Sequence, residues 1–418
     1  MKIAILGSGI QGVFSAWWLA QAGHEVFVVD RCNGPALETS FANGGQISIA
    51  YSEPLASTHL IYDIFKSIFR YDYPLKFYPH FDRYQWLWGF KFLRECLPWN
   101  FLPNITAMIR MTEYSQKILK IMQNELNINY HCLKYGVLNF YRNKKEFEHA
   151  KKIVNLMNDL GVNRKILTAD ETVKIEPALF QLSNFIKGGD YTPEDESGDA
   201  YIFTCELAKK CQEIGVKFFY QTTINRLLTE LDRIKSVELI RPDGYYETLS
   251  ADIYVVALGS YSPFILRPLG IQCNIYPIKG YSATLEIINP DLAPSVSITD
   301  THNRMVLSRI GNKLRFATSA ELSGYSRNLN ESRCKRLTQI AQELFPEALN
   351  FEKIMYWSGL RPSTPSGIPL IGRTKFKNLF MNTGHGSLGW TMGAGSSRAL
   401  ADIIEGVCPE PEFPFISL

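Results

Sequence analysis

The sequence predicts an α/β fold in which a Rossmann-type nucleotide-binding domain contains an inserted α+β domain built on an antiparallel sheet. Three observations support this prediction. The chain has 418 residues, enough for two or three domains. Residues 1–30 follow the order strand, glycine turn, helix, strand, which is typical of a βαβ unit. Between residues 271 and 355, short runs of alternating apolar residues are typical of antiparallel strands.

The composition excludes several classes of protein. Hydrophobic residues make up 46% of the chain and no low-complexity segment occurs, so the chain is not intrinsically disordered. The 44 basic and 41 acidic side chains nearly balance, and no Lys/Arg block gives reason to expect nucleic acid as a partner. No run of 18 uncharged apolar residues occurs, so no transmembrane helix is expected.

Cysteine and histidine are scattered along the chain. The eight cysteines include no C-x-x-C pair, and the two nearest in sequence, Cys205 and Cys211, lie in an expected helix. This scatter favours reduced thiols and a cytoplasmic location. Neither the cysteines nor the seven histidines form a ligand set, so no metal site is predicted.

The amino terminus allows two incompatible interpretations. A single lysine, a long apolar run and Ala20-Gln21-Ala22 resemble a secretory signal peptide. Alternatively, a strand at Lys2–Leu6 leads through a turn at 7–12 into a helix over 13–22, and a second strand follows at Glu25–Val29. Cleavage of a signal would delete the first strand of a βαβ unit that is complete in order and spacing. We therefore favour the βαβ unit.

Each position of the turn Gly7-Ser8-Gly9-Ile10-Gln11-Gly12 has a role in dinucleotide binding. Gly7 allows the tight turn, Gly9 lets the backbone approach a diphosphate, and Gly12 lets the helix pack against the strand. The positive end of the helix favours phosphates. Asp30 lies 18 residues after the last glycine and is placed to bind a ribose. The alternative is a chance glycine turn; no second such motif occurs, which predicts one dinucleotide.

Two segments after Asp30 remain open to two interpretations each. The small and amide residues of 37–48 are suited to contact a distal phosphate and a ring system, or else form a polar loop with turn glycines. Residues 59–103 hold 15 aromatic residues and six Lys/Arg in 45 positions, with an expected helix over 84–97. They form either an aromatic core and domain interface, or a surface that lies on a membrane with basic residues facing lipid phosphates.

The remaining elements are expected from periodicity and turn residues. A short acidic turn region is expected at 171–179, and the acidic segment 188–199 is expected to be a solvated loop, because it lacks the full calcium-loop pattern. A turn is expected around 222–224. Helices are expected over 110–125, 144–160, 200–215 and 331–345, and strands over 136–142, 216–220, 253–258, 275–285, 303–310 and 313–320.

The carboxyl-terminal region has the most chemistry. In the stretch 357–372, Arg361 lies among glycines, prolines and turn residues, where we expect a stiff backbone, and its planar fork suits bidentate binding of a carboxylate. A structural arginine in a loop is the alternative. A strand over 379–382 then leads through the glycine-rich segment 383–390 to the last helix, over 391–405. That helix start favours negative charge, although an ordinary glycine-rich turn with His385 on the surface is also compatible.

Taken together, the motifs closely resemble one family. They are the turn 7–12 with Val-Val-Asp30-Arg31, the loop Glu38-Thr39-Ser40 through Asn43 to Ser48, Tyr276-Pro277-Ile278-Lys279-Gly280-Tyr281-Ser282, Gly359-Leu360-Arg361-Pro362, and the segment from Asn382 to Thr391. The chain is similar to the bacterial D-amino-acid dehydrogenases of the small-subunit type, within the D-amino-acid oxidase and glycine oxidase family of flavoproteins. The resemblance covers essentially the whole chain.

The resemblance implies a cofactor, FAD, and a division into domains. The FAD-binding domain is expected to comprise 1–50, 144–270 and 356–418, and the substrate domain 51–143 and 271–355. The residues expected to bind FAD are Gly7, Gly9, Ile10, Gln11, Gly12, Asp30, Arg31, Thr39, Ser40, Asn43, Gly44, Gly45, Gln46, Ile47, Ile224, Ala257, Gly259, Gly384, His385, Gly386, Ser387 and Leu388.

The resemblance also implies oxidative deamination of D-amino acids, with hydride passing from Cα to flavin N5 and the imine hydrolysed to a 2-oxo acid and ammonia. Arg361 is expected to pair with the α-carboxylate, and Tyr281, Tyr51 and His385 are further catalytic candidates. A quinone-type electron acceptor and contact with the inner face of the cell membrane through 59–103 are expected. The alternatives are an oxidase of glycine, sarcosine or a 2-hydroxy acid that uses oxygen, and a flavin-binding subunit without turnover.

Overall fold

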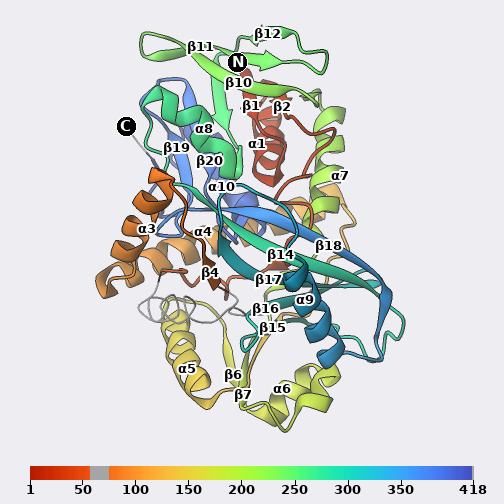
Figure 1. Ribbon diagram of the computed structural model, residues 1–418. Helices are drawn as coiled ribbons and strands as arrows, with labels where there is room; N and C mark the ends of the chain where they lie inside the picture. Colours follow the sequence, from red (N-terminus) through yellow and green to blue (C-terminus); the bar gives the residue numbers. More distant parts are fainter. Residues whose placement is uncertain (57–74, 417–418) are drawn as a thin grey trace.

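A computed structural model of the chain describes residues 1–56 and 75–416, and in it two large sheets meet side by side (Figure 1). In the first sheet the strand order is β19-β20-β13-β1-β2-β9, parallel except for the β19–β20 pair. The strands are β1 (Lys2–Leu6), β2 (Glu25–Val29), β9 (Lys217–Phe219), β13 (Ile253–Val256), β19 (Leu370–Arg373) and β20 (Leu379–Thr383).

Alternation along β1 explains how this sheet is covered on both faces. Ile3 and Ile5 point into one apolar cluster, and Ala4 and Leu6 into another. The first cluster is closed by α1 (Ile10–Gln21), α7 (Ala200–Glu213) and α10 (Gly389–Ile404), and the long helix over 98–126 adds to it. The second is closed by α8 (Ser262–Leu266) and a three-stranded antiparallel sheet of β10 (Thr223–Glu230), β11 (Arg233–Ile240) and β12 (Tyr246–Leu249). This is a Rossmann-type arrangement.

The second sheet has nine strands among the described residues. Its order is β18-β14-β17-β16-β15-β5-β7-β6, and β4 pairs with β17. The strands are β4 (Leu75–Phe77), β5 (Val137–Tyr141), β6 (Lys165–Leu167), β7 (Gly188–Thr192), β14 (Tyr276–Ile287), β15 (Ser297–Asp300), β16 (Met305–Ile310), β17 (Lys313–Leu322) and β18 (Leu349–Ser363). The sheet is mixed, because the β15–β5 and β17–β4 pairs are parallel. Helix α9 (Glu331–Leu344) packs on one of its faces.

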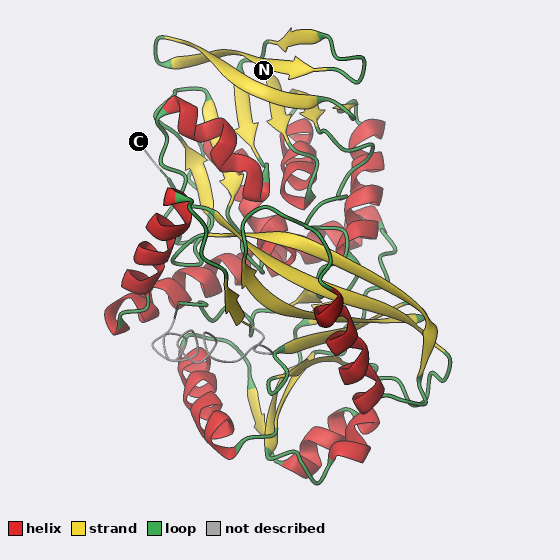
Figure 2. Ribbon diagram, in the orientation of Figure 1, coloured by secondary structure: helices red, strands yellow, loops and turns green. Residues whose placement is uncertain are grey.

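Three further helices, α3 (Arg83–Glu95), α5 (Lys144–Asp159) and α6 (Ala169–Ile175), lie beside the second sheet, and α4 (Pro98–Leu126) packs against α10; Figure 2 shows helices on the outside of both sheets. The long helix α4 crosses α10 closely, because Gly395 lies against the backbone of Ser115 and donates its N–H to the Ser115 hydroxyl at 3.0 Å. Within the described part of the chain, none of the helices is both long and apolar enough to cross a bilayer.

Several expectations about local structure are wrong. The region 171–179 is not a simple turn, because a capping box of Thr168 and Glu171 starts helix α6. Thr223 and Ile224, expected in a turn, begin strand β10. Helix α4 begins at Pro98, twelve residues before the expected start at 110, because proline is tolerated in a first helical turn.

The acidic segment 188–199 is also not a solvated loop. It forms β7 and the short strand β8 (Glu196–Ser197), and its carboxylates at 190, 195, 196 and 199 are buried. Each has partners distant in sequence: for example, Asp190 accepts from Arg164 Nε at 2.7 Å, and Asp195 accepts from the Ser48 hydroxyl and the Ile49 N–H. Burial raises the pKa of Asp195 to about 6 against these hydrogen bonds. Sequence alone could not show these partners.

Sheet membership also differs from the expected domain ranges. Strands β6 and β7 lie within 144–270, the range expected for the nucleotide-binding domain, yet they pair with each other and β7 pairs with β5 of the second sheet. Likewise β18 crosses residue 356 and pairs with β14 along its length, from Leu349 to Ser363.

Candidate active site

A cavity of about 800 Å³ is lined by segments of both large sheets. It brings together nearly all of the residues that sequence reasoning selected. These are Gly7, Gly9, Ile10, Gln11, Asp30, Arg31, Thr39, Ser40, Asn43, Gly44, Gly45, Gln46, Tyr51, Ile224, Ala257, Gly259, Tyr281, Arg361, Gly384, His385, Gly386, Ser387 and Leu388. Two expected residues, Gly12 and Ile47, do not line it.

Gly12 has a packing role behind the cavity. A Cβ atom added there would lie 1.9 Å from the carbonyl oxygen of Gly7, so only glycine lets α1 approach the turn. Gly7 itself has φ +108°, and a Cβ there would lie 2.6 Å from the carbonyl oxygen of Ala257. Ile47 is buried in β3 (Gln46–Ile47), which pairs with β8.

The acid after β2 is fixed at the edge of the cavity. One oxygen of Asp30 accepts from the Ser8 N–H at 2.7 Å, and the other accepts from the Cys32 N–H at 2.9 Å. The neighbouring Arg31 pairs with Glu38 at 2.6 Å and stacks over the ring of Tyr261. The turn, the acid and the arginine therefore form one preorganised rim.

Two helices point their positive ends at the same cavity. Helix α1 begins at Ile10 and α10 begins at Gly389, and both of these residues line the cavity. In neither helix does the residue before the first turn cap it with its own side chain, and neither has an acidic residue in its first turn. Their N–H groups and dipoles therefore favour negative charge at two separate places. A dinucleotide with a diphosphate and an electron-rich ring fits this arrangement.

The loop that follows Arg31 lies on the second sheet. The Thr39 hydroxyl donates to the Leu360 carbonyl at 2.7 Å, and the Ser40 hydroxyl accepts from the Ile10 N–H at 3.3 Å. A Cβ at Gly44 would lie 3.2 Å from Val306, so this part of the loop approaches β16 closely. The loop thereby connects the start of α1 to β16 and β18.

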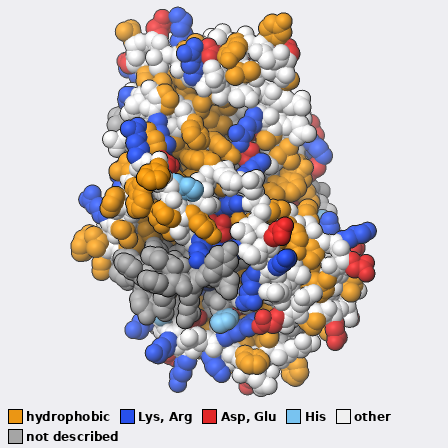
Figure 3. Space-filling view, in the orientation of Figure 1, with side chains coloured by type: hydrophobic (Ala, Val, Ile, Leu, Met, Phe, Trp, Pro, Cys, Tyr) orange, Lys and Arg blue, Asp and Glu red, His pale blue; other side chains and the backbone are white. Residues whose placement is uncertain are grey.

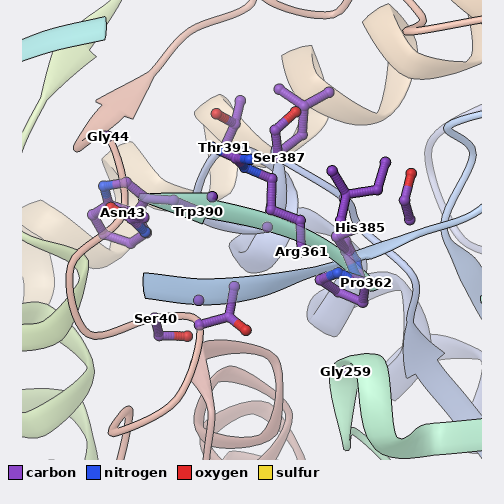
Figure 4. Close-up of a pocket in the computed structure, with 18 of the residues that line it drawn as sticks. Ser40, Asn43, Gly44, Gly259, Arg361, Pro362, His385, Ser387, Trp390 and Thr391 are labelled. Carbon is purple, nitrogen blue, oxygen red and sulfur yellow. The ribbon is translucent and has the colours of Figure 1, made fainter. Parts of the chain in front are cut away.

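Arg361 lies on strand β18 and not in a loop, opposite Ile278 of β14. Figure 4 shows it amid the other labelled lining residues, between the loop from Ser40 to Gly44 and the segment from His385 to Thr391. Burial lowers the pKa of Arg361, and the interaction with Tyr51 acts in the opposite direction. Tyr51 lies at the rim with 43% of its surface exposed. The strand thus presents a guanidinium inside the cavity, with a phenol beside it.

Tyr281 is among the lining residues, yet its side chain packs in the core of the second sheet. Its ring is in the apolar cluster beneath α9, and its hydroxyl donates to Glu321 at 3.0 Å. Glu321 also accepts from Arg333 Nε at 2.8 Å. Burial, and then the charge of Glu321, raise the pKa of Tyr281 well above its usual value. This placement argues against a direct catalytic part for the Tyr281 hydroxyl.

His385 is buried, so the alternative of a surface turn residue is wrong. Its Nε2 lies 3.0 Å from the Ser396 hydroxyl, which itself donates to Gln11 Oε1 at 3.2 Å. The same hydroxyl also lies 3.3 Å from the Gly393 carbonyl oxygen, so it connects the imidazole to the backbone of α10. Burial lowers the pKa of His385 to about 3, so the ring stays neutral and supports the start of α10.

Sequence reasoning missed several residues that line the cavity. Trp357 precedes Arg361 by four residues on the same strand face, and the period of two along β18 could have indicated it. A polar wall of Asn139, Tyr141 and Arg164 forms around Asp190. No signal in the sequence indicates this wall, because its members are brought together only by sheet pairing.

The fold and the cavity together define a flavin-dinucleotide-dependent oxidoreductase. A sequence model of the family described as FAD dependent oxidoreductase matches residues 2–403. The chain belongs to this family, and FAD is its cofactor. The family match confirms the resemblance drawn from the motifs and the expectation of an enzyme.

Curated relatives and solved structures agree with this assignment. The chain is 46% identical to a D-amino acid dehydrogenase of Dechloromonas aromatica over 416 residues, 100% of both chains. It is 44% identical to a D-amino acid dehydrogenase of Paramagnetospirillum magneticum, covering 97% of this chain and 95% of that one. A glycine oxidase structure from Geobacillus kaustophilus has a TM-score of 0.76 at 18% identity, covering 99% and 96% of the two chains, and this shows the shared fold alone.

Proposed function

We propose that the chain oxidatively deaminates D-amino acids. The observation that supports this most directly is the guanidinium of Arg361 inside the cavity that the dinucleotide motif lines. A planar guanidinium binds a carboxylate with two parallel hydrogen bonds. The substrate loses a hydride from Cα and a proton from nitrogen, and water then converts the imine to a 2-oxo acid and ammonia. The D configuration is proposed from the curated relatives named D-amino acid dehydrogenase.

The two sheets indicate which part of the chain binds FAD and which part binds the substrate. We propose that the Rossmann-type sheet with its helices forms the FAD-binding domain, and that the second sheet forms a substrate domain inserted into it, with strand β18 passing between them. Relative to the ranges 1–50, 144–270 and 356–418, sheet membership favours assigning 144–192 and 356–363 to the substrate domain. Arg361 then belongs to the substrate domain and faces the cofactor cavity.

The residues of this chain orient the substrate more than they exchange protons with it. FAD, when bound, accepts the hydrogen and two electrons removed from the substrate carbon. Gly9, the N–H groups at the start of α1 and Asp30 would hold its diphosphate and ribose, and residues 384–388 would face its ring. Arg361 fixes the carboxylate, and the neutral His385 leaves the charge at the start of α10 unchanged. Orientation of this kind can supply about 7 kcal/mol or more of the barrier reduction.

An anaerobic comparison of enantiomers tests the proposed function. The purified holoenzyme is mixed with D- and L-alanine, D- and L-proline, glycine, sarcosine and lactate without oxygen, and flavin absorbance is followed. Bleaching by D-amino acids with little effect of the L forms is expected. Bleaching by glycine, sarcosine or lactate alone, with peroxide formed under air, would instead establish the oxidase alternative. A flavin that no compound bleaches would contradict an enzymatic role.

We further propose that electrons pass to a quinone-type acceptor at a membrane surface. The described part of 59–103 supports this. Six apolar side chains of α3 and the start of α4 are exposed, and we call them the α3 patch: Trp86, Leu87, Phe90, Leu93, Trp99 and Leu102. Figure 3 shows hydrophobic side chains gathered over this part of the molecule, with basic residues nearby. Arg94 is exposed on the same helix and can face lipid phosphates. Residues 59–74 of the expected surface lie outside the described part of the chain.

Removing two aromatic anchors should release the protein from vesicles. Phe90 and Trp99 are 68% and 69% exposed, so their replacement by serine leaves the core intact. Each buried aromatic contributes about 1.5–3 kcal/mol to partitioning, so Phe90→Ser with Trp99→Ser should weaken binding by roughly 100-fold or more. Flotation with phosphatidylglycerol-containing vesicles measures this.

The control replaces Leu231 and Tyr246 by serine. Both are exposed apolar residues outside α3: Leu231 lies in the turn between β10 and β11, and Tyr246 begins β12. Their replacement should leave flotation unchanged. Equal flotation of both double variants, or no flotation of the unmodified protein, would contradict membrane contact through the α3 patch.

A further inference from the structure

We infer that Gly280 is a positioning residue for Arg361. Because Gly280 has no side chain, the guanidinium of Arg361 can lie directly against its backbone. The inference rests on the proposed function, because it explains how the carboxylate anchor is held. Arg361 is the anchor, and Gly280 acts only through it. The argument depends on how β14 and β18 pair in front of the cavity.

The guanidinium lies flat on the backbone of Gly280. A Cβ atom added to Gly280 would be 2.5 Å from Nη1, 2.6 Å from Cζ and 2.6 Å from Nη2 of Arg361. Three nearly equal distances place the added atom over the face of the guanidinium plane. The N–H groups of arginine radiate in that plane, so this contact occupies the face and not the donors.

A second glycine extends the same open patch. Gly359 of β18 is directly opposite Gly280 of β14. A Cβ at Gly359 would lie 2.0 Å from Cη2 of Trp357, so the indole covers this glycine as the guanidinium covers the other. Trp357, Gly359 and Arg361 alternate onto one face of β18. The paired glycines Gly280 and Gly359 therefore expose a stretch of backbone, and the flat side chains of Arg361 and Trp357 lie against it.

Space, and not backbone conformation, is what requires glycine here. Neither Gly280 nor Gly359 has a φ angle in the left-handed region, so alanine can adopt either backbone. Gly280 also lies where the register of β14 against β17 shifts, between Lys279 and Tyr281. Such irregularities occur where a sheet re-aims side chains next to a site. An alanine at 280 should leave the strand in place and displace the arginine.

The displacement can be sized from the contact distances. Ordinary contact begins near 3.4 Å and the added Cβ would lie at 2.5 Å, a difference of about 0.9 Å. The far end of a flexible side chain can move by this amount without disturbing the fold. A misplacement of about 1 Å at a binding group can cost roughly 100-fold in rate. We therefore expect Gly280→Ala to raise KM and lower kcat/KM by about 10- to 100-fold.

The experiment is a double-mutant cycle on the holoenzyme, with Gly280→Ala, Arg361→Ala and the two combined. Affinity for benzoate, a carboxylate that cannot be oxidised here, is measured from the flavin spectrum, alongside kcat and KM for D-alanine. Gly280→Ala should weaken benzoate binding at least tenfold alone and have no further effect once Arg361 is alanine. The FAD content and the thermal midpoint of Gly280→Ala should equal those of the unmodified protein.

Gly89→Ala is the matched control, because Gly89 lies in α3 with no atom within 4 Å of an added Cβ. It should change neither benzoate affinity nor kinetics. Additive effects of Gly280→Ala and Arg361→Ala, or unchanged benzoate affinity in Gly280→Ala, would overturn the inference while leaving the proposed function intact. Benzoate affinity that is insensitive to Arg361→Ala would instead overturn the anchor itself, and with it both proposals.

Discussion

Replacing Arg361 by alanine is expected to lower kcat/KM for D-alanine or D-proline by about 10- to 150-fold, mostly through KM. This range follows from the loss of a charge-assisted hydrogen bond, which contributes about 1.5–3 kcal/mol. The substrate carboxylate would then enter the cavity without the guanidinium that binds it. The substitution removes only a side chain that lines the cavity, and the backbone of β18 stays paired with β14. The fold and the bound FAD should therefore be retained.

Arg361→Lys separates charge from geometry. Lysine keeps the positive charge but lacks the planar fork, so most of the loss should remain. The control is Arg226→Ala, which removes an exposed arginine that pairs with Glu238 between β10 and β11. Steady-state kinetics under a fixed acceptor concentration measure all three variants. An unchanged kcat/KM in Arg361→Ala would remove the carboxylate assignment.

Gly12→Ala should be the most damaging single substitution in the nucleotide turn. The new methyl group would lie 1.9 Å from the carbonyl oxygen of Gly7, and neither backbone segment can give way without separating α1 from β1. We expect a loss of about 3 kcal/mol or more in stability, together with loss of FAD. Soluble yield, thermal midpoint and the ratio of flavin to protein measure this effect.

Gly9→Ala is the variant to compare with Gly12→Ala, because the two glycines belong to one motif but have different roles. At Gly9 the nearest atom to an added Cβ is the Ser40 hydroxyl at 3.8 Å, and the backbone is extended. The fold should therefore persist, while the methyl group projects into the dinucleotide site. FAD affinity should drop by about 1–3 kcal/mol, or roughly 5- to 150-fold. Two variants of equal stability and equal flavin content would contradict this division of roles.

The first sheet could be predicted in detail, and the second only in outline. Strands at Lys2–Leu6 and Glu25–Val29 were predicted as observed, because buried parallel strands are continuous apolar runs between glycine turns. The buried carboxylate Asp190 was expected in water, because its partner Arg164 lies 26 residues away and meets it only across the sheet. Acidic residues are usually exposed, and only tertiary pairing reverses that rule.

The site shows the same limit. The motifs brought most of the cavity residues to notice: some follow strands, as the turn 7–12 follows β1, and others lie within strands, as 276–282 does in β14 and 359–362 does in β18. They did not show where a side chain ends: Tyr281 is among the lining residues, yet its hydroxyl donates to Glu321 beneath α9. Gly280, its neighbour, was part of a quoted motif without an assigned role. Its role depends on Arg361, 81 residues later in the chain. The two residues meet only because β14 and β18 pair in one particular register.

The pairing of β14 with β18 also limits how the site can change in length. Side chains on a strand alternate between faces, so inserting or deleting one residue between Gly359 and Arg361 would turn the arginine toward α9 and away from the cavity. The turn between β11 and β12, at 241–245, has no such constraint and can grow or shrink freely. Side chains along β18 can therefore be exchanged without changing the register that holds Arg361 in the cavity, whereas changes in chain length are tolerated in the turn between β11 and β12.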